Sequence, residues 1–214
     1  MSKQPVRASV RSVNSPEAVL RAALTALSCC REEQVSLDEY LDSHLHDPQL
    51  RRRLSNLLFN CCRHRRQVQK AIDACCRKKP EKRLYDLLTA ALTMAAFQNS
   101  LVPESVVNIA VTLAKKEFSA SAGRFVNAVL RKALTLIELN SAELLPPMIE
   151  KRWKERFEPE VFKFLTDLFI TPAPGTVRLR NDFEVTGELA DELVPLELET
   201  PWRFFQCNDL GNLL

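Results

Sequence analysis

Apolar residues recur at intervals of three to four positions through most of this 214-residue chain. That interval puts them on one side of an α-helix, so the pattern predicts helices with one buried face. Glycine, a poor helix former that tight turns need, occurs at only four positions. The clearest stripe lies in 50–75, and others lie in 16–33, 81–97, 103–116 and 119–139. The chain should therefore fold into an all-α bundle of about six or seven helices, ending near residue 141.

Short polar side chains stand where these helices should begin. Such side chains accept hydrogen bonds from the first free backbone N–H groups of a helix. A proline or an acidic residue in the first turn strengthens the signal. The predicted caps are Asn14-Ser15, Ser36, Asp47, and either Ser119 or Ser121.

The basic residues of the 50–75 stretch lie opposite its apolar stripe if the stretch is one continuous helix. Arg65 is the exception, because it points toward the stripe. Either the helix is interrupted near His64, or the Arg65 side chain extends outward to solvent. The cations that would share the exposed side are Arg52, Arg63, Arg66, Lys70 and Arg77.

The formal net charge of +3 conceals a strong asymmetry. Residues 51–83 contain 12 Lys and Arg against two acidic residues, a local net charge of +10. Residues 181–214 contain one Arg against eight acidic residues, a local net charge of −7. A solvated helix surface normally mixes the two signs, whereas this basic stretch has only Asp73 and Glu81. The asymmetry indicates an anionic partner for residues 51–83.

Nucleic-acid binding is the function that these charges favour, because phosphate contacts need many Lys and Arg side chains on one face. The alternative is a solvated surface with no ligand. Asn127, between apolar neighbours, is expected to make a structural hydrogen bond. The candidate RNA-binding residues are Arg52, Arg63, Arg66, Lys70, Arg77, Lys78, Lys79, Lys82, Arg83, Arg124, Arg131 and Lys132.

The sequence offers no catalytic or metal site. Phosphate-binding loops need closely spaced glycines, and the four glycines here lie 52, 12 and 24 residues apart. The cluster of Cys61, Cys62 and His64 with Cys75 and Cys76 fits core packing better than zinc, because adjacent cysteines point to different helix faces. With three histidines, all in 44–64, no Ser/His/Asp set can be argued. We expect no metal and no catalytic residue.

Seven cysteines occur as three adjacent pairs plus Cys207, and neighbouring cysteines do not bridge easily. We interpret them as reduced residues of a cytoplasmic protein. No uncharged apolar stretch is long enough to span a membrane. Residues 1–14 contain Ser, Lys and Arg but no acid, which favours a basic arm over a transit peptide.

The helical pattern ends before the chain does. Pro146-Pro147 is a boundary, followed by two amphipathic pieces at about 147–157 and 159–170. After the Pro-rich breaker at 171–175, apolar residues alternate as they do in a strand. We expect strands at 176–180 and 202–206 and a helix at 185–193. The predicted organisation is a basic arm (1–14), a helical domain (15–142), a helical linker (143–171) and the truncated start of an α/β subdomain (172–214).

The stretch Phe125-Val126-Asn127-Ala128-Val129-Leu130-Arg131 resembles the last helix of NusB-like RNA-binding domains. Val102-Pro103, with the apolar and Lys positions that follow up to Lys115, is similar to the preceding helix of that family. The stretch Leu57–Arg66 resembles the family's central basic segment. The resemblance covers residues 15–141 and implies an RNA-binding helical bundle.

The helix ending in FVNAVLRK, followed by a Pro-marked linker, is similar to the N-terminal domain of Sun-type 16S rRNA cytosine-5 methyltransferases. Pro147–Ile149 with Trp153 resembles their linker helix, and Thr176–Asn181 and Phe205–Asp209 resemble two strands ahead of their cofactor-binding fold. Cys207 and Asn208 depart from the usual residues there. The family needs S-adenosylmethionine, a Gly-rich loop and a nucleophilic Cys after Pro, and this chain has no Pro-Cys pair.

The resemblance thus implies an RNA-binding front end of a methyltransferase, with 16S rRNA as its partner. The catalytic domain is absent from these 214 residues, so the chain alone is expected to be inactive. Two other hypotheses stay open. One is a stand-alone antitermination or ribosome-assembly factor that binds RNA together with a small ribosomal protein, as NusB does. The other is a protein-interaction bundle with no RNA role.

Overall fold

The computed structural model describes residues 15–98, 101–139, 145–170, 175–180, 182, 184–186, 193–197 and 203–207. The predicted basic arm at 1–14 and the Pro-rich breaker at 171–174 lie outside these residues. The chain divides into two compact units, residues 1–166 and 167–214, and each is described by itself.

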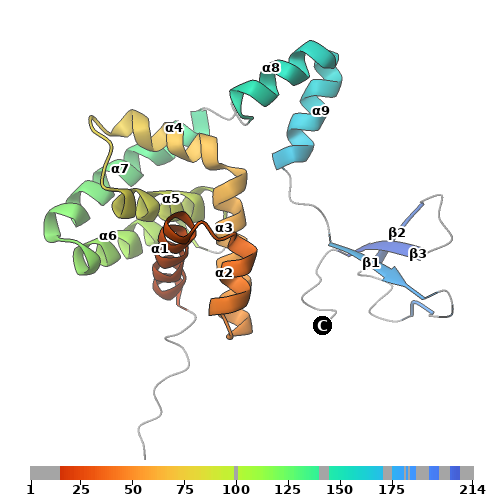
Figure 1. The fold of residues 1–214 in the computed structure, drawn as a ribbon, viewed down its shortest axis with the longest axis horizontal. Helices are drawn as coiled ribbons and strands as arrows, with labels where there is room; N and C mark the ends of the chain where they lie inside the picture. The colour runs from red at the N-terminus through yellow and green to blue at the C-terminus, as the bar shows by residue number, and fades with distance from the viewer. Residues whose placement is uncertain are drawn as a thin grey trace, which may run out of the picture. The chain divides into compact units, whose positions relative to one another are not determined.

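The first unit contains the predicted all-α bundle (Figure 1). Its helices begin and end close to where the apolar periodicity places them, including the short helix that follows Ser36. The helices of the bundle are α1 (Pro16–Glu33), α2 (Leu37–His44), α3 (Pro48–Arg63), α4 (Arg65–Cys75), α5 (Lys82–Phe97), α6 (Pro103–Glu117) and α7 (Ala120–Leu139).

Side-chain caps form at the predicted helix starts. The Ser15 hydroxyl accepts a hydrogen bond from the Ala18 N–H at 3.2 Å, at the start of α1. Asp47 Oδ1 accepts from the Gln49 and Leu50 N–H groups at 2.9 and 3.0 Å, at the start of α3. These bonds satisfy backbone donors that have no partner inside the helix. Ser36 caps α2 and Ser119 caps α7 in the same way.

Of the two alternatives for residues 50–75, the interruption near His64 is confirmed, and the single continuous helix is not formed. Helix α3 ends at Arg63 and α4 begins at Arg65, turning away from the axis of α3 (Figure 1). The His64 ring stacks on Phe97 of α5 with ring centroids 3.6 Å apart, and this contact fixes the bend. Arg65 consequently lies exposed at the start of a new helix.

Helix α5 is the central element of the bundle. It is buried on nearly all sides, and α1, α3, α4, α6 and α7 all pack against it. A helix that is apolar around its whole circumference is stable only when its neighbours cover it. Its buried carboxylate, Asp86, accepts two hydrogen bonds from Arg31 Nη1 of α1, at 2.7 and 2.6 Å. This ion pair joins the first helix to the core.

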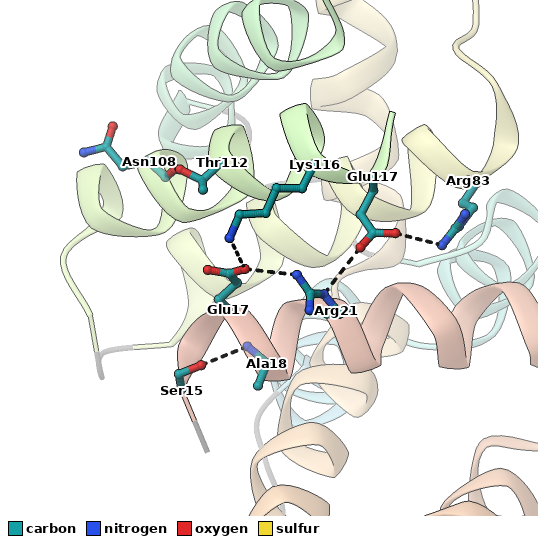
Figure 2. Close-up of polar contacts among 9 residues, drawn as sticks. All are labelled: Ser15, Glu17, Ala18, Arg21, Arg83, Asn108, Thr112, Lys116 and Glu117. Carbon is teal, nitrogen blue, oxygen red and sulfur yellow. Dashed lines mark hydrogen bonds and ion pairs between the residues drawn. The ribbon is translucent and has the colours of Figure 1, made fainter. Parts of the chain in front are cut away.

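An ion-pair network also joins α1 to α6 and α5 on the surface (Figure 2). Lys116 Nζ lies 2.8 Å from Glu17 Oε1, and Arg21 of α1 contacts both Glu17 and Glu117 at 3.1 and 3.4 Å. Glu117 in turn accepts a hydrogen bond from Arg83 of α5 at 3.3 Å. The network alternates in sign, so its cations are already neutralised by neighbouring carboxylates.

Beyond the bundle, α8 (Pro147–Arg156) and α9 (Pro159–Ile170) confirm the two predicted amphipathic pieces. Trp153 and Phe157 meet edge to face with ring centroids 6.3 Å apart. The Lys154 ammonium lies 5.4 Å from the centre of the Phe162 ring, so the side chains of the two helices meet where the chain turns.

The second unit contains a three-stranded antiparallel sheet of order β1-β3-β2. The strands are β1 (Gly175–Leu179), β2 (Leu193–Leu196) and β3 (Arg203–Cys207). Phe205 of β3 pairs with Val177 on one side and Pro195 on the other. Its small core consists of Leu193, Phe205 and Cys207. The two predicted strands are present, and the fold class, mainly α with a short terminal sheet, is confirmed.

The predicted helix at 185–193 is wrong at both described ends. Residues 184–186 have no helical structure, and Leu193 begins strand β2; residues 187–192 lie outside the described part. The cause is long-range pairing, because Leu193 lies opposite Cys207 and buries its side chain in the sheet. Packing against neighbouring strands commonly overrides a local helical pattern. Pro195 is tolerated because β2 is an edge strand.

Candidate nucleic-acid interface

The basic residues of α3 and α4 lie opposite the faces that these helices bury. On α3 the buried side chains are Leu54, Leu57, Leu58, Asn60 and Cys61. On α4 they are Val68, Ala71 and Ile72. The amphipathic pattern therefore turns the cations of both helices outward, although the break at His64 puts them on two helix faces instead of one. The cations concerned are Arg52 and Arg63 on α3 and Arg66 and Lys70 on α4.

Three of these cations gather around the break between the helices. Arg63 ends α3, and Arg66 and Lys70 occupy the first two turns of α4 on the same side, four residues apart. Arg52 lies eleven residues before Arg63, which is about 16 Å along the α3 axis. The predicted surface is therefore extended, with its densest charge at the α3–α4 junction.

Helix α7 contributes one cation beside the end of α4. The two helices lie side by side (Figure 1). Burial raises the pKa of the Cys75 thiol at the end of α4, and the nearby positive charge of Lys132 opposes that rise. Lys132 is thus close enough to the end of α4 for its charge to act on Cys75.

The other two cations of α7 lie two turns apart on its solvent side, where both are exposed. Arg124 lies in the first turns of the helix. Arg131 Nε donates to Asn127 Oδ1 at 3.1 Å, so Asn127 makes a structural hydrogen bond as expected. Arg131 also lines a cavity of about 730 Å³ with Glu104 and Thr135, between the end of α5, the start of α6 and α7.

The segment between α4 and α5 carries exposed cations outside any helix. Arg77 lies here, beyond the end of α4, and not on a helix face as the sequence predicted. Lys78 is exposed beside it, and the Lys79 ammonium lies 5.1 Å from the centre of the Tyr85 ring. Lys82 begins α5 and is also exposed.

Arg83 differs from its neighbours because the fold already uses it. Its guanidinium donates to Glu117 at 3.3 Å (Figure 2). It also lies 5.7 Å from the centre of the Phe118 ring. Of the two acidic residues in the basic stretch, Asp73 accepts a hydrogen bond from the Tyr85 hydroxyl at 3.0 Å. Burial, that hydrogen bond and the Asp73 charge together raise the pKa of Tyr85.

Two of the predicted binding residues have notable surroundings. Arg63 Nη1 donates to Asn60 Oδ1 at 2.9 Å, which holds its guanidinium in place. Arg66 Nη1 is shielded from solvent and has no hydrogen-bond acceptor in the described part of the chain. A shielded guanidinium N–H without an acceptor is costly.

Sequence reasoning missed two residues of α3, Asn56 and Phe59. Both are exposed, and they lie between Arg52 and Arg63 at helical spacing. The signal was present in the intervals of four, three and four residues, which put all four side chains on one stripe. Attention to charge alone passed over the uncharged members of that stripe.

The described residues hold no group of three or more His, Cys, Asp or Glu placed to bind a metal ion. All seven cysteines are free thiols. Burial raises the pKa of Cys61 to about 12, which leaves it protonated and unreactive at neutral pH. Within the described helices, none has the length and apolar character needed to cross a bilayer.

Comparison with known proteins gives a family for the helical unit. The sequence model of the NusB family matches residues 17–135, which is more than half of the chain. This confirms the resemblance of the bundle to NusB-like domains. No curated protein matches the chain.

The solved structures that are similar to the chain include the following two. A crystal structure of PH0851 is 15% identical, with a TM-score of 0.53, and the similarity covers 94% of this chain and 51% of that one. The chain thus spans about half the length of that protein. The second, a crystal structure of a plectonemic RNA supercoil, is 18% identical with a TM-score of 0.49, and covers 59% of this chain and 97% of that one. At these identities the likeness concerns the fold alone.

Proposed function

Because the chain belongs to the NusB family, we propose that it is an RNA-binding domain. In this proposal the cations of α3, α4 and the segment that joins α4 to α5 bind the phosphate backbone. The observation that carries it is the net charge of +10 in residues 51–83, whose cations lie on the faces of α3 and α4 that the core does not use, in the segment that joins α4 to α5, and at the start of α5. Proteins that neutralise several phosphates bind largely through the release of counterions.

The local geometry supports phosphate as the ligand. Arg63 is held by Asn60, so less side-chain freedom is lost when it binds. Arg83 has a smaller role in this proposal, because Glu117 already neutralises it.

We further propose that the RNA is 16S rRNA and that the domain is the front end of an S-adenosylmethionine-dependent cytosine-5 methyltransferase. The two stretches that resemble that family's strands lie on β1 and β3, which pair with each other. Residues 181 and 208–209 of those stretches lie outside the described part. The likeness to PH0851 extends over both units of this chain, in a protein about twice as long.

The residues of this chain do not fit S-adenosylmethionine itself. Its glycines are too far apart to form a cofactor loop, and no Pro-Cys pair supplies the family's nucleophile. In this proposal both the cofactor site and the catalytic thiol lie outside these 214 residues. The role of the domain is to bind and position RNA.

A charge-removal experiment tests the RNA-binding proposal. Arg63, Arg66 and Lys70 are changed together to Gln, and the affinity for an rRNA fragment is measured against salt concentration. Loss of three phosphate contacts should reduce the slope of log affinity against log salt by about 2, at roughly 0.7 for each contact with a single strand. Affinity at low salt should fall as well.

A matched triple change controls for net charge. Lys151, Arg152 and Arg156 on α8 carry the same total charge and lie outside the proposed interface. Changing these three to Gln should leave the salt slope close to that of the unmodified chain. Equal slopes for the unmodified chain and the α3–α4 variant would contradict the proposed interface.

A further inference from the structure

Helix α3 carries a stripe of four residues, of which the proposed phosphate contacts account for the two arginines but not for Asn56 and Phe59. Arg52, Asn56, Phe59 and Arg63 lie at intervals of four, three and four positions, within about 60° around the helix axis. The stripe lies opposite the buried Leu54, Leu57 and Cys61 side chains. Along the solvent side of one helix, the stripe therefore carries a cation, an amide, an aromatic ring and a second cation, in that order.

Phe59 is the unusual member of this stripe. Its exposed fraction is 39%, whereas Leu57 and Leu58 on the same turn are fully buried. Among the described residues of α1–α7 it is the only exposed Phe, Tyr or Trp. Phe59 is not among the residues that α3 buries in the core of the bundle. An exposed aromatic ring that shares a helix stripe with two arginines is the combination that stacks with nucleobases.

Asn56 offers hydrogen-bond donors next to that ring. Its Oδ1 accepts two hydrogen bonds, one from Asn60 Nδ2 at 3.0 Å and one from Nε2 of Gln98, the residue that follows α5, at 2.7 Å. The acceptor is thus used, and the amide position is fixed by α3 and the end of α5 together. Within the described part of the chain no acceptor binds Asn56 Nδ2. Its N–H groups are therefore presented to solvent one turn from Phe59.

We propose that this stripe binds single-stranded RNA, with Phe59 stacking on an unpaired base, Arg52 and Arg63 binding the flanking phosphates, and Asn56 donating to a base carbonyl or phosphate oxygen. The inference rests on the proposed RNA-binding function and specifies its ligand. A duplex keeps its bases stacked inside and offers mainly phosphates and 2′-hydroxyls. Only an unpaired base can place its π-face on Phe59.

Three ligands of equal length separate base stacking from backbone binding. They are a single-stranded RNA of about ten nucleotides, the same strand annealed to its complement, and a strand in which the bases are absent. Binding is measured by fluorescence anisotropy at a fixed salt concentration. Phe59 is changed to Ala, Leu and Trp, and Phe164→Ala on α9 removes another exposed phenylalanine as a control.

Phe59→Ala and Phe59→Leu should each weaken binding of the single strand by about 5- to 150-fold, the loss measured when one stacking residue is removed. Phe59→Trp, which keeps a π-face, should bind within about threefold of the unmodified chain. Affinity for the duplex and for the strand without bases, and the salt slope, should be the same in all variants. Phe164→Ala should change nothing. The Leu variant preserves apolar packing, and circular dichroism checks that each variant is folded.

Two results overturn the stacking proposal and leave RNA binding intact. One is unchanged affinity of the Ala and Leu variants for the single strand. The other is an equal loss on the strand without bases, which would mean that Phe59 acts through the backbone contacts. Failure of the unmodified chain to bind any of the three ligands would instead contradict the proposed function itself.

Discussion

Replacing Asp86 with alanine tests whether the buried ion pair between α1 and α5 holds the bundle together. The Asp86 side chain is 12% exposed and accepts both of its short hydrogen bonds from Arg31 Nη1. Ser28 of α1 donates a third at 3.3 Å. The change removes all three hydrogen bonds and leaves a cation at the boundary of the core.

The expected loss in the free energy of unfolding is about 2–3 kcal/mol. Breaking a fully buried ion pair costs roughly 3–5 kcal/mol, because one charge is left without a partner. The Arg31 side chain is 34% exposed, so water can reach the guanidinium and the cost falls below that range. Arg31→Met should cost more, about 3 kcal/mol, because the charge that it strands is the more buried carboxylate.

Urea unfolding followed by far-ultraviolet circular dichroism measures both variants and the double variant. Because the two residues share one interaction, the double variant should lose at least about 1 kcal/mol less than the sum of the single losses. The reasoning would be refuted if Asp86→Ala stayed within about 0.5 kcal/mol of the unmodified chain, as surface changes do, and the two losses were additive.

Two further predictions concern α3. Asp47→Ala removes the hydrogen bonds from the Gln49 and Leu50 N–H groups and should lower the free energy of unfolding by about 1 kcal/mol. Asp47→Asn keeps an acceptor and should retain most of that stability. Equal melting temperatures for the Ala variant and the unmodified chain would contradict the cap. Burial raises the pKa of Cys61 from its ordinary value of 9.0 to about 12. The contribution of the neutral Cys61 thiol to the free energy of unfolding is therefore fully present below pH 9.0 and is lost as the pH rises toward 12. Cys61→Ala should remove that part of the pH dependence, and alkylation at neutral pH should modify exposed Cys62 first.

The bundle was predictable because its signals are local. Each helix repeats its apolar residues at the helical period, and side chains such as Ser15, Asp47 and Ser119 cap the backbone within three residues of themselves. The break at His64 was only half predictable. Arg65 showed that the pattern failed there, but the stacking of His64 on Phe97, which fixes the bend, joins residues far apart in the sequence.

The predicted helix at 185–193 failed for the same reason. Leu193 and its neighbours carry a pattern that fits a helix, and only their pairing with β3 makes them a strand. A period read over a few residues cannot include a partner that lies ten or more positions further along the chain. The assignment of β2 depended on contacts that the sequence does not display, whereas β1 and β3 followed from their local alternation.

The sequence predicted which segment of the candidate interface is rich in cations, but not which of those cations the folded surface leaves available. Counting cations cannot show that Arg83 is neutralised by Glu117, because the two residues are 34 positions apart. Nor can it show that Gln98, 42 positions from Asn56, orients the amide beside Phe59. Which cations meet a ligand depends on partners that only the fold assembles.

The location of bound RNA tests the account most directly. Ultraviolet crosslinking of an rRNA fragment to the unmodified chain, followed by mass spectrometry of the crosslinked peptides, measures it. The account predicts crosslinks within α3, α4 and the segment leading to Lys82, including the peptide that contains Phe59. Crosslinks confined to α1, α2 and the sheet, with none in residues 48–83, would contradict it.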